Sequence, residues 1–279
     1  MDAKTHRQKE PIHTDINRKT RTSPIRTCQM ESKAQQSQKS NRRTCWKEVF
    51  QKIKYPSCLL IGMRRSGKSF LIKQMLIEDS LLSDYDIIIV FTNSFNREHY
   101  INCGVEEDNI QHDATAERIQ DILDFQEESK KKNLEMLNVC VVLDDCFGSR
   151  KEKTGRMSDA ITKIYSLGRH MKIAVIVALQ DIRYSSHLLN NTDLAFFFPN
   201  GIRKKSQREF IKNELISNFT EDQKKIDECF KNDKHQFTVC HLTSESDEFE
   251  DCIMKGKVPL KIVNFKIKKE FKDIVYDRL

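Results

Sequence analysis

The sequence lacks any long hydrophobic segment. No stretch approaches the roughly 18–20 consecutive apolar residues that a transmembrane helix requires. The N-terminal residues contain no apolar run of the kind found in a secretory signal. We therefore expect a soluble, intracellular protein with no membrane association.

Closely spaced cysteine pairs are also missing. The chain has nine cysteines, an odd number, and no pair shows C-x-x-C spacing. This pattern predicts neither a zinc site nor a disulfide framework. Cys58 and Cys140 lie inside apolar runs and are interpreted as small core residues. We expect reduced thiols, as in a reducing compartment.

The net charge of the 279-residue chain, +7, is confined to one segment. Residues 1–45 contain eleven basic and four acidic residues, so the remainder carries no net charge. This segment has few apolar residues and cannot bury enough surface to offset its chain entropy. We expect a disordered basic arm at 1–45. It would contact phosphates, serve as a nuclear address, or remain a solvated tail without a partner.

From residue 46 onward, short apolar runs alternate with longer amphipathic stretches. The runs are continuous and rich in Ile and Val, which is typical of parallel strands covered on both faces. We expect strands at 58–61, 87–92, 139–143, 173–178 and 194–198 and helices at 67–82, 116–133, 157–170 and 206–217. This alternation predicts a doubly wound, mostly parallel α/β sheet within one domain, 46–279.

The last part of this domain, 206–279, is less regular. After the helix expected at 206–217, residues 220–233 favour a helix, and 236–243 and 258–267 favour strands. We expect this part either to extend the sheet or to form a small lid.

A phosphate-binding P-loop is predicted where the first apolar run ends. The motif reads Gly62-Met63-Arg64-Arg65-Ser66-Gly67-Lys68-Ser69, followed by Phe70, and lies between a predicted strand and a predicted helix. The glycines allow the backbone N–H groups to converge on a phosphate, and the helix adds its positive N-terminal end. Lys68 is expected to reach the β- and γ-phosphates of ATP, and the Ser69 hydroxyl to bind Mg²⁺.

Three residues of this loop are unusual, because small residues are common at their positions. Met63, Arg64 and Arg65 are larger. The two arginines would either add positive potential near the phosphates or face solvent or a neighbour. We include the whole segment 62–70 among the expected nucleotide-binding residues.

Two carboxylates end the apolar run at 139–143. In a Walker B element, an acid at the end of such a strand holds the magnesium ion. We expect Asp144 to serve Mg²⁺ and Asp145 to orient the attacking water. The distance in sequence between Lys68 and Asp144 indicates an additional strand between the two motifs. This places the chain in the additional-strand class of P-loop NTPases.

A third polar element follows the run 173–178. In the additional-strand class, this strand lies between the strands that carry the two motifs, and its end points at the γ-phosphate. Gln180 is therefore expected to contact the phosphate or the water, with Lys68 and Asp145 as the other catalytic residues. A surface or helix-capping glutamine is the structural alternative.

The motif order resembles a known family. Gly168-Arg169-His170 stands shortly before an apolar strand that ends in Gln, and a strand ending in two aspartates precedes it. Val90-Phe91-Thr92, Asn96, Tyr100 and Asn191 add to the likeness. Over roughly residues 55–205 the chain resembles the DNA-packaging ATPases of poxviruses, other large DNA viruses, virophages and Maverick/Polinton transposons, which belong to the FtsK–HerA group of P-loop motors.

This resemblance implies a homo-oligomeric ring that hydrolyses ATP with Mg²⁺. The ring would push double-stranded DNA, without sequence preference, into a capsid through a capsid or portal-like partner. The implied location is the nucleus, a viral factory or the virion. Arg169, Arg183 and Arg203 lie near strand ends, and one of them could act in trans on the ATP of a neighbouring subunit. The family often has an arginine where Leu189 stands, so Arg183 or Arg203 would have to substitute for it.

Two other interpretations remain open. The chain could be a cellular P-loop ATPase of another branch, helicase-like or AAA-type. It could also be a non-catalytic, nucleotide-binding assembly factor, although the Asp144–Asp145 pair argues against that. The basic loop around residues 150–153 would touch DNA or remain solvated.

Overall fold

The computed structural model describes residues 45–77, 81–92, 97–112, 114–146, 156–180, 186–231 and 233–258. The expected basic arm, except Cys45, lies outside the described residues. So do Arg183, Asn96, the basic loop around 150–153 and the expected strand at 258–267, except Val258. Within the described ranges, no helix has the length and apolar character needed to span a membrane.

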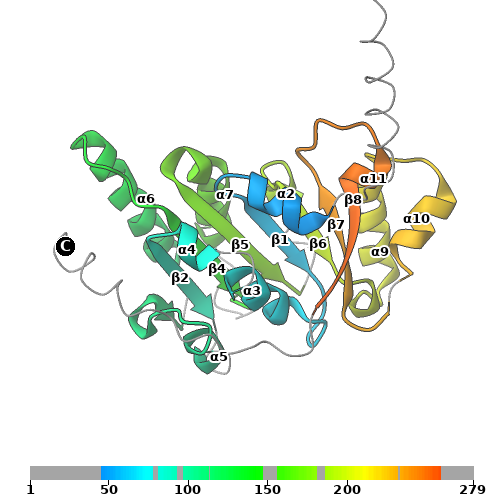
Figure 1. The fold of residues 1–279 in the computed structure, drawn as a ribbon, viewed down its shortest axis with the longest axis horizontal. Helices are drawn as coiled ribbons and strands as arrows, with labels where there is room; N and C mark the ends of the chain where they lie inside the picture. The colour runs from blue at the N-terminus through cyan, green and yellow to red at the C-terminus, as the bar shows by residue number, and fades with distance from the viewer. Residues whose placement is uncertain are drawn as a thin grey trace, which may run out of the picture. The chain divides into compact units, whose positions relative to one another are not determined.

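In the described part of the chain, eight strands form one sheet in the order β3-β2-β4-β5-β1-β6-β7-β8 (Figure 1). They are β1 (Ser57–Ile61), β2 (Ile87–Thr92), β3 (Ile110–Gln111), β4 (Val139–Asp144), β5 (Ile173–Leu179), β6 (Leu194–Phe197), β7 (Gln236–His241) and β8 (Ile253–Lys257). Neighbours from β3 to β6 are parallel, whereas β7 and β8 are antiparallel additions. The predicted mostly parallel α/β sheet is confirmed, and β5 lies between β1 and β4 as expected.

Helices cover both faces of this sheet. Their bounds are α2 (Trp46–Lys52), α3 (Lys68–Ile77), α4 (Leu81–Asp84), α5 (Arg97–Ile101), α6 (Ala116–Lys131), α7 (Arg156–Leu167), α8 (Ser186–Leu189), α9 (Lys205–Ile211), α10 (Gln223–Cys229) and α11 (Phe249–Cys252), with short 3₁₀ turns η3 (Glu107–Asn109), η5 (Gly168–Met171) and η7 (Pro199–Gly201). One core contains α6, α7, α9 and α10, and the other contains α2, α3 and α5. Figure 1 shows α6 near the β2 end of the sheet and α9 and α10 near β7 and β8.

The two cores explain why the strand sequences are continuously apolar. In β1, Leu59 and Ile61 belong to one core, while Cys58 and Leu60 belong to the other. Successive side chains of a strand point to opposite faces, so a sheet covered on both faces buries every residue. All five residues of β1 are buried.

Helix α2 was not predicted from its local sequence. The ring of Trp46 meets those of Phe196 and Phe237 edge to face, each at a centroid distance of 5.6 Å. Gly256 makes room for this cluster, because a Cβ there would lie 2.2 Å from Phe237 Cζ. The helix is therefore held by contacts with residues far along the chain, which its own short pattern does not reveal.

Up to residue 258, the last part of the chain extends the sheet rather than forming a separate lid. β7 begins where the strand at 236–243 was expected, and pairs with β6. The helix expected at 220–233 is shorter, as α10. β8 was missed, since the sequence pattern favoured a strand further on. Helix α9 continues as a π-helical turn, η8 (Lys212–Ile216).

Candidate active site

The predicted P-loop connects the end of β1 to the start of α3. Two residues of the loop have a positive φ, Arg65 at 60° and Gly67 at 114°. A side chain at Gly67 would be strained. A Cβ at Gly62 would lie 2.6 Å from Ser66 Oγ. Gly67 is therefore required by the backbone path, and Gly62 by the side chain of Ser66 packed against it.

Lys68 lies buried at the first position of α3, only 6% exposed. Its Nζ donates hydrogen bonds to the carbonyl oxygens of Gly62, at 2.6 Å, and Met63, at 3.1 Å. Burial lowers the pKa of Lys68, while the nearby carboxylates of Asp144 and Asp145 raise it. The ammonium group is thus held between the loop and the two acids.

Asp144 ends β4 and is 1% exposed. The Tyr100 hydroxyl donates a hydrogen bond of 2.8 Å to its Oδ2. Its Oδ1 is buried without a hydrogen-bond partner among the described residues. Burial raises the pKa of Asp144, and the hydroxyls of Ser69 and Tyr100 and the charge of Lys68 oppose this rise. One carboxylate oxygen is therefore fixed, while the other remains available.

Asp145 and Gln180 meet beside this acid. Asp145 has a left-handed backbone, with a φ of 57°. Gln180 follows β5, and its Nε2 donates a hydrogen bond to Asp145 Oδ1. Strands β4 and β5 pair in parallel register, so their carboxyl ends lie at the same edge of the sheet. The fold brings together Lys68, Asp145 and Gln180, the three residues predicted to be catalytic.

The oxygen donors at this edge fit a magnesium ion. Mg²⁺ prefers hard oxygen ligands, and proteins bind it through one or two side chains plus phosphates and water. Asp144 offers its unpartnered Oδ1, and the Ser69 hydroxyl lies close enough to lower the pKa of that carboxyl. Within the described residues, no group of three or more His, Cys, Asp or Glu side chains could hold a metal. With Asp144 and Ser69 as side-chain ligands, phosphate and water would fill the remaining positions around the ion.

Four large side chains of the predicted nucleotide segment are exposed. Met63 is 41% and Phe70 44% exposed, and Arg64 and Arg65 are also exposed. Arg64 is close enough to lower the pKa of Lys68. The Lys73 ammonium lies 5.0 Å from the centroid of the Phe70 ring. These side chains surround the loop without packing into either core.

Several residues beside the P-loop were not identified from the sequence as part of the site. A Cβ at Gly201 would lie 3.0 Å from the backbone N of Met63, so the turn η7 packs closely on the loop. Phe198, which follows β6, and His235, in the turn before β7, border Gly67. Tyr100 was named from the sequence only as part of the family resemblance. No local signal marks these residues, because their proximity comes from the sheet order.

Arg169 does not join this site. Its guanidinium pairs with Asp193, which also accepts a hydrogen bond of 2.8 Å from Ser57 N. Ser57 begins β1 and Asp193 immediately precedes β6, so this cluster lies at the amino edge of the sheet, opposite the P-loop. Arg203 is exposed at the carboxyl side, two residues after Gly201.

No protein-family model and no curated protein matches the chain. Solved structures do match. The genome-packaging NTPase B204 from Sulfolobus turreted icosahedral virus 2 with AMPPCP has a TM-score of 0.50 and 15% identity, covering 75% of this chain and 100% of that one. The same protein with sulfate gives 0.52 and 16%, with 75% and 99% covered.

A second kind of neighbour is the cytoplasmic domain of the type VII secretion ATPase EccC from Thermomonospora curvata. Its TM-score is 0.51 at 13% identity, over 73% of this chain and 25% of that one. At such identities, the likeness establishes the fold. Together with the strand–loop–helix site, it defines the chain as having the α/β fold of P-loop NTPases.

Proposed function

We propose that the chain is an ATP-dependent motor that hydrolyses ATP with Mg²⁺ and moves double-stranded DNA into a viral or transposon capsid. One observation carries the catalytic part of this proposal. Lys68, Asp144, Asp145 and Gln180 come from three adjacent strands and their following segments, and all lie at one edge of the sheet. Phosphoryl transfer needs such a set of one cation, one metal-binding acid and one water-positioning group.

The proposed phosphate-binding role belongs to the loop and its helix. The backbone N–H groups of residues 62–69 and the N-terminal end of α3 attract the phosphates. Lys68 neutralises negative charge on the β- and γ-phosphates. Ser69 and Asp144 would hold the magnesium ion, which supplies further charge neutralisation when bound.

The proposed water-positioning role belongs to Asp145. Its carboxylate orients the attacking water and takes up a proton from it. The hydrogen bond from Gln180 fixes the orientation of this carboxylate. Because Gln180 directly follows β5, the strand beside β1 and its P-loop, it would respond to the presence of the γ-phosphate.

The packaging part of the proposal has two supports. The fold is similar to that of B204, a genome-packaging NTPase. The motif order resembles the packaging ATPases of poxviruses, virophages and Maverick/Polinton elements. We propose a homo-oligomeric ring with a capsid or portal-like partner, working in the nucleus, a viral factory or the virion.

Hydrolysis assays with and without double-stranded DNA test this proposal. We expect DNA to stimulate turnover of the native chain. Lys68→Ala should weaken nucleotide binding, whereas Asp145→Asn should retain nucleotide binding and lose hydrolysis. Lys130→Ala, on an exposed position of α6, is a matched control that should behave like the native chain. Absence of hydrolysis in the native chain would overturn the enzymatic proposal.

A second candidate function is polypeptide rather than DNA translocation. The similarity to the secretion ATPase EccC favours it. In the same assay, hydrolysis that does not respond to DNA would favour this candidate over packaging. Hydrolysis of GTP alongside ATP would define the nucleotide preference, which neither sequence motif specifies.

A further inference from the structure

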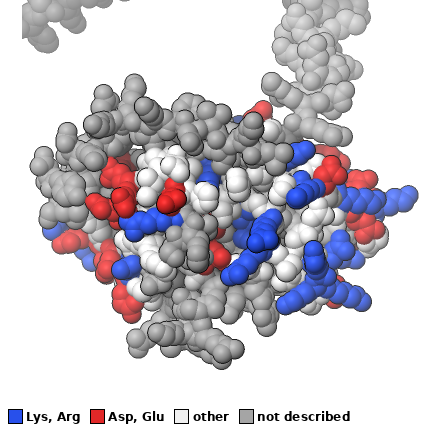
Figure 2. All heavy atoms as spheres, turned by 90° about the horizontal axis from the view of Figure 1, so that it is seen from below, with Lys and Arg blue, Asp and Glu red and all other residues white. Residues whose placement is uncertain are grey.

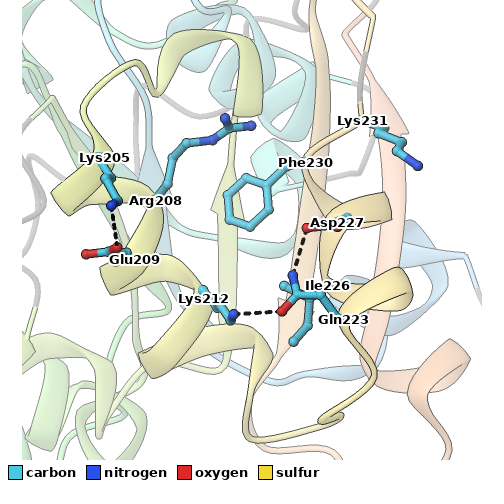
Figure 3. A pocket seen from close by; sticks show the side chains of 9 residues that line it. All are labelled: Lys205, Arg208, Glu209, Lys212, Gln223, Ile226, Asp227, Phe230 and Lys231. Carbon is cyan, nitrogen blue, oxygen red and sulfur yellow. Dashed lines mark hydrogen bonds and ion pairs between the residues drawn. The ribbon is translucent and has the colours of Figure 1, made fainter.

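A cationic groove lies between α9 and α10, away from the P-loop motif itself. Lys205, Arg208, Lys212 and Lys231 surround a recess of about 430 Å³ whose side is formed by Phe230 (Figure 3). We refer to these five residues as the cationic groove. It faces solvent. Lys205 and Arg208 lie on α9, Lys212 begins η8, and Phe230 and Lys231 follow the end of α10.

Arg208 is the cation of the groove that stacks on an aromatic ring. Its guanidinium carbon lies 5.1 Å from the centroid of the Phe230 ring. The Phe230 ring also packs against Phe197 of β6, at a centroid distance of 5.6 Å. A guanidinium stacked on an aromatic face keeps the N–H donors along its edge free for an anion. Stacking therefore leaves the guanidinium of Arg208 able to donate two hydrogen bonds to one phosphate group.

Two acids also line the recess, but the positive charges outnumber them. Glu209 lies 3.8 Å from Lys205, in an exposed pair. Asp227 accepts a hydrogen bond of 2.8 Å from Gln223, whose Oε1 accepts one of 2.9 Å from Lys212. Among the described residues, Arg208 and Lys231 have no ion-pair partner. Four cations and two acids therefore line the recess, a balance that suits a polyanion.

The groove is connected to the P-loop through a short segment. The turn η7 packs on the loop at Gly201, and α9 begins soon afterward, at Lys205. On the other side, α10 leads through a turn to His235, beside Gly67. Figure 2 shows Lys and Arg side chains gathered over the half of the molecule that carries these elements. Short segments of chain therefore join both sides of the groove to residues that pack on the P-loop.

We propose that the cationic groove contacts the phosphate backbone of double-stranded DNA. This inference rests on the proposed DNA-motor function and names the surface that holds the substrate. Backbone contacts are independent of sequence, which a packaging motor requires. The placement also gives a physical route by which a nucleotide-dependent change at the loop would alter the grip on DNA.

The test uses full-length protein and a fluorescent DNA duplex of random sequence, at several salt concentrations. The double variant Arg208→Ala/Lys212→Ala should raise the dissociation constant about tenfold and lower the slope of log K against log salt by about two. Lys130→Ala/Lys131→Ala removes the same charge from α6 and should leave both unchanged. Lys205→Ala/Lys231→Ala, at exposed positions, repeats the test without touching the stacked arginine.

The outcomes distinguish failure of the groove proposal from failure of the motor proposal on which it rests. ATP hydrolysis without DNA should stay native in all three variants, which shows that they fold. If native protein binds DNA and the groove variants bind it equally well, the groove proposal is wrong and the motor proposal stands. If native protein does not bind DNA, both fall. Lost self-association with unchanged DNA affinity would identify a second copy of the chain as the occupant and overturn the proposal.

Discussion

Two buried aspartates at opposite edges of the same sheet have very different surroundings. Asp193 and Asp144 are each 1% exposed. Asp193, at the amino edge, accepts hydrogen bonds from Ser57 N, Arg169 and Thr243. Asp144, at the carboxyl edge, has one oxygen bound by Tyr100 and one without a hydrogen bond in the described structure.

The difference separates a stabilising acid from a chemically available one. A buried carboxylate with all its partners supports the fold, whereas a buried oxygen left unpartnered is costly unless a ligand uses it. In the sequence, Asp144 follows its apolar run and Asp193 precedes its own, and only the position of Asp144 predicts a role at the site. Their hydrogen bonds distinguish them.

The largest expected effect is on activity at Asp144. Asp144→Asn removes the charge proposed to hold magnesium, so hydrolysis should fall on the order of 10²-fold or more. Because burial raises the pKa of this acid, the neutral amide should leave thermal stability equal or higher. Hydrolysis and thermal unfolding, measured on the same preparation, check both results. A strongly destabilised but active variant would contradict the comparison.

The next effect is on stability at Asp193. Asp193→Asn weakens the contacts to Ser57 N and Arg169, and should lower the free energy of unfolding by about 2 kcal/mol. The Arg169 side chain is 57% exposed, so solvent compensates part of the loss. Denaturant unfolding measures the change. Hydrolysis by the folded fraction should remain native, and a loss of turnover without a loss of stability would count against a structural role.

A smaller effect distinguishes two buried tyrosines. Tyr100→Phe removes the hydroxyl that positions Asp144, and should raise the magnesium concentration for half-maximal hydrolysis about tenfold. Tyr165→Phe is the matched control, because its hydroxyl donates a hydrogen bond of 2.7 Å to the Cys58 carbonyl. Both variants should lose about 1 kcal/mol of stability. Equal magnesium requirements in the two variants would show that Tyr100 acts only in packing.

The smallest effect is expected at Arg169. Arg169→Lys keeps the charge beside Asp193 but loses the planar donor group, and should cost about 0.5–1 kcal/mol. Chemical denaturation would measure this cost. Mixing the variant with native subunits tests whether Arg169 acts in trans on a neighbouring subunit. Strong inhibition of native subunits, with stability unchanged, would indicate that Arg169 acts across a subunit boundary.

Much of the fold could be predicted because parallel strands have a strong local signature. The five continuous apolar runs became β1, β2, β4, β5 and β6. The order of the motifs also fixed the place of β5 between β1 and β4. Helix α2 and strand β8 escaped prediction, since Trp46 and Gly256 are explained only by the aromatic cluster they share.

The candidate site was predictable only in part. Motif spacing identified Lys68, Asp144, Asp145 and Gln180, because phosphate chemistry requires these residue types at strand ends. Tyr100 and Gly201 carry no such local pattern. Their places depend on how α5 and η7 pack against neighbouring strands, so only contacts across the sheet identify them.

The sequence by itself determined the fold class, the P-loop and the acidic strand end, since each follows from residue types at short spacing. Tertiary structure decided which carboxylate oxygen is available, which arginine lies at the opposite edge, and which lysines form a groove with Phe230. These properties depend on distances between distant segments, and hydrophobic packing of both sheet faces sets those distances.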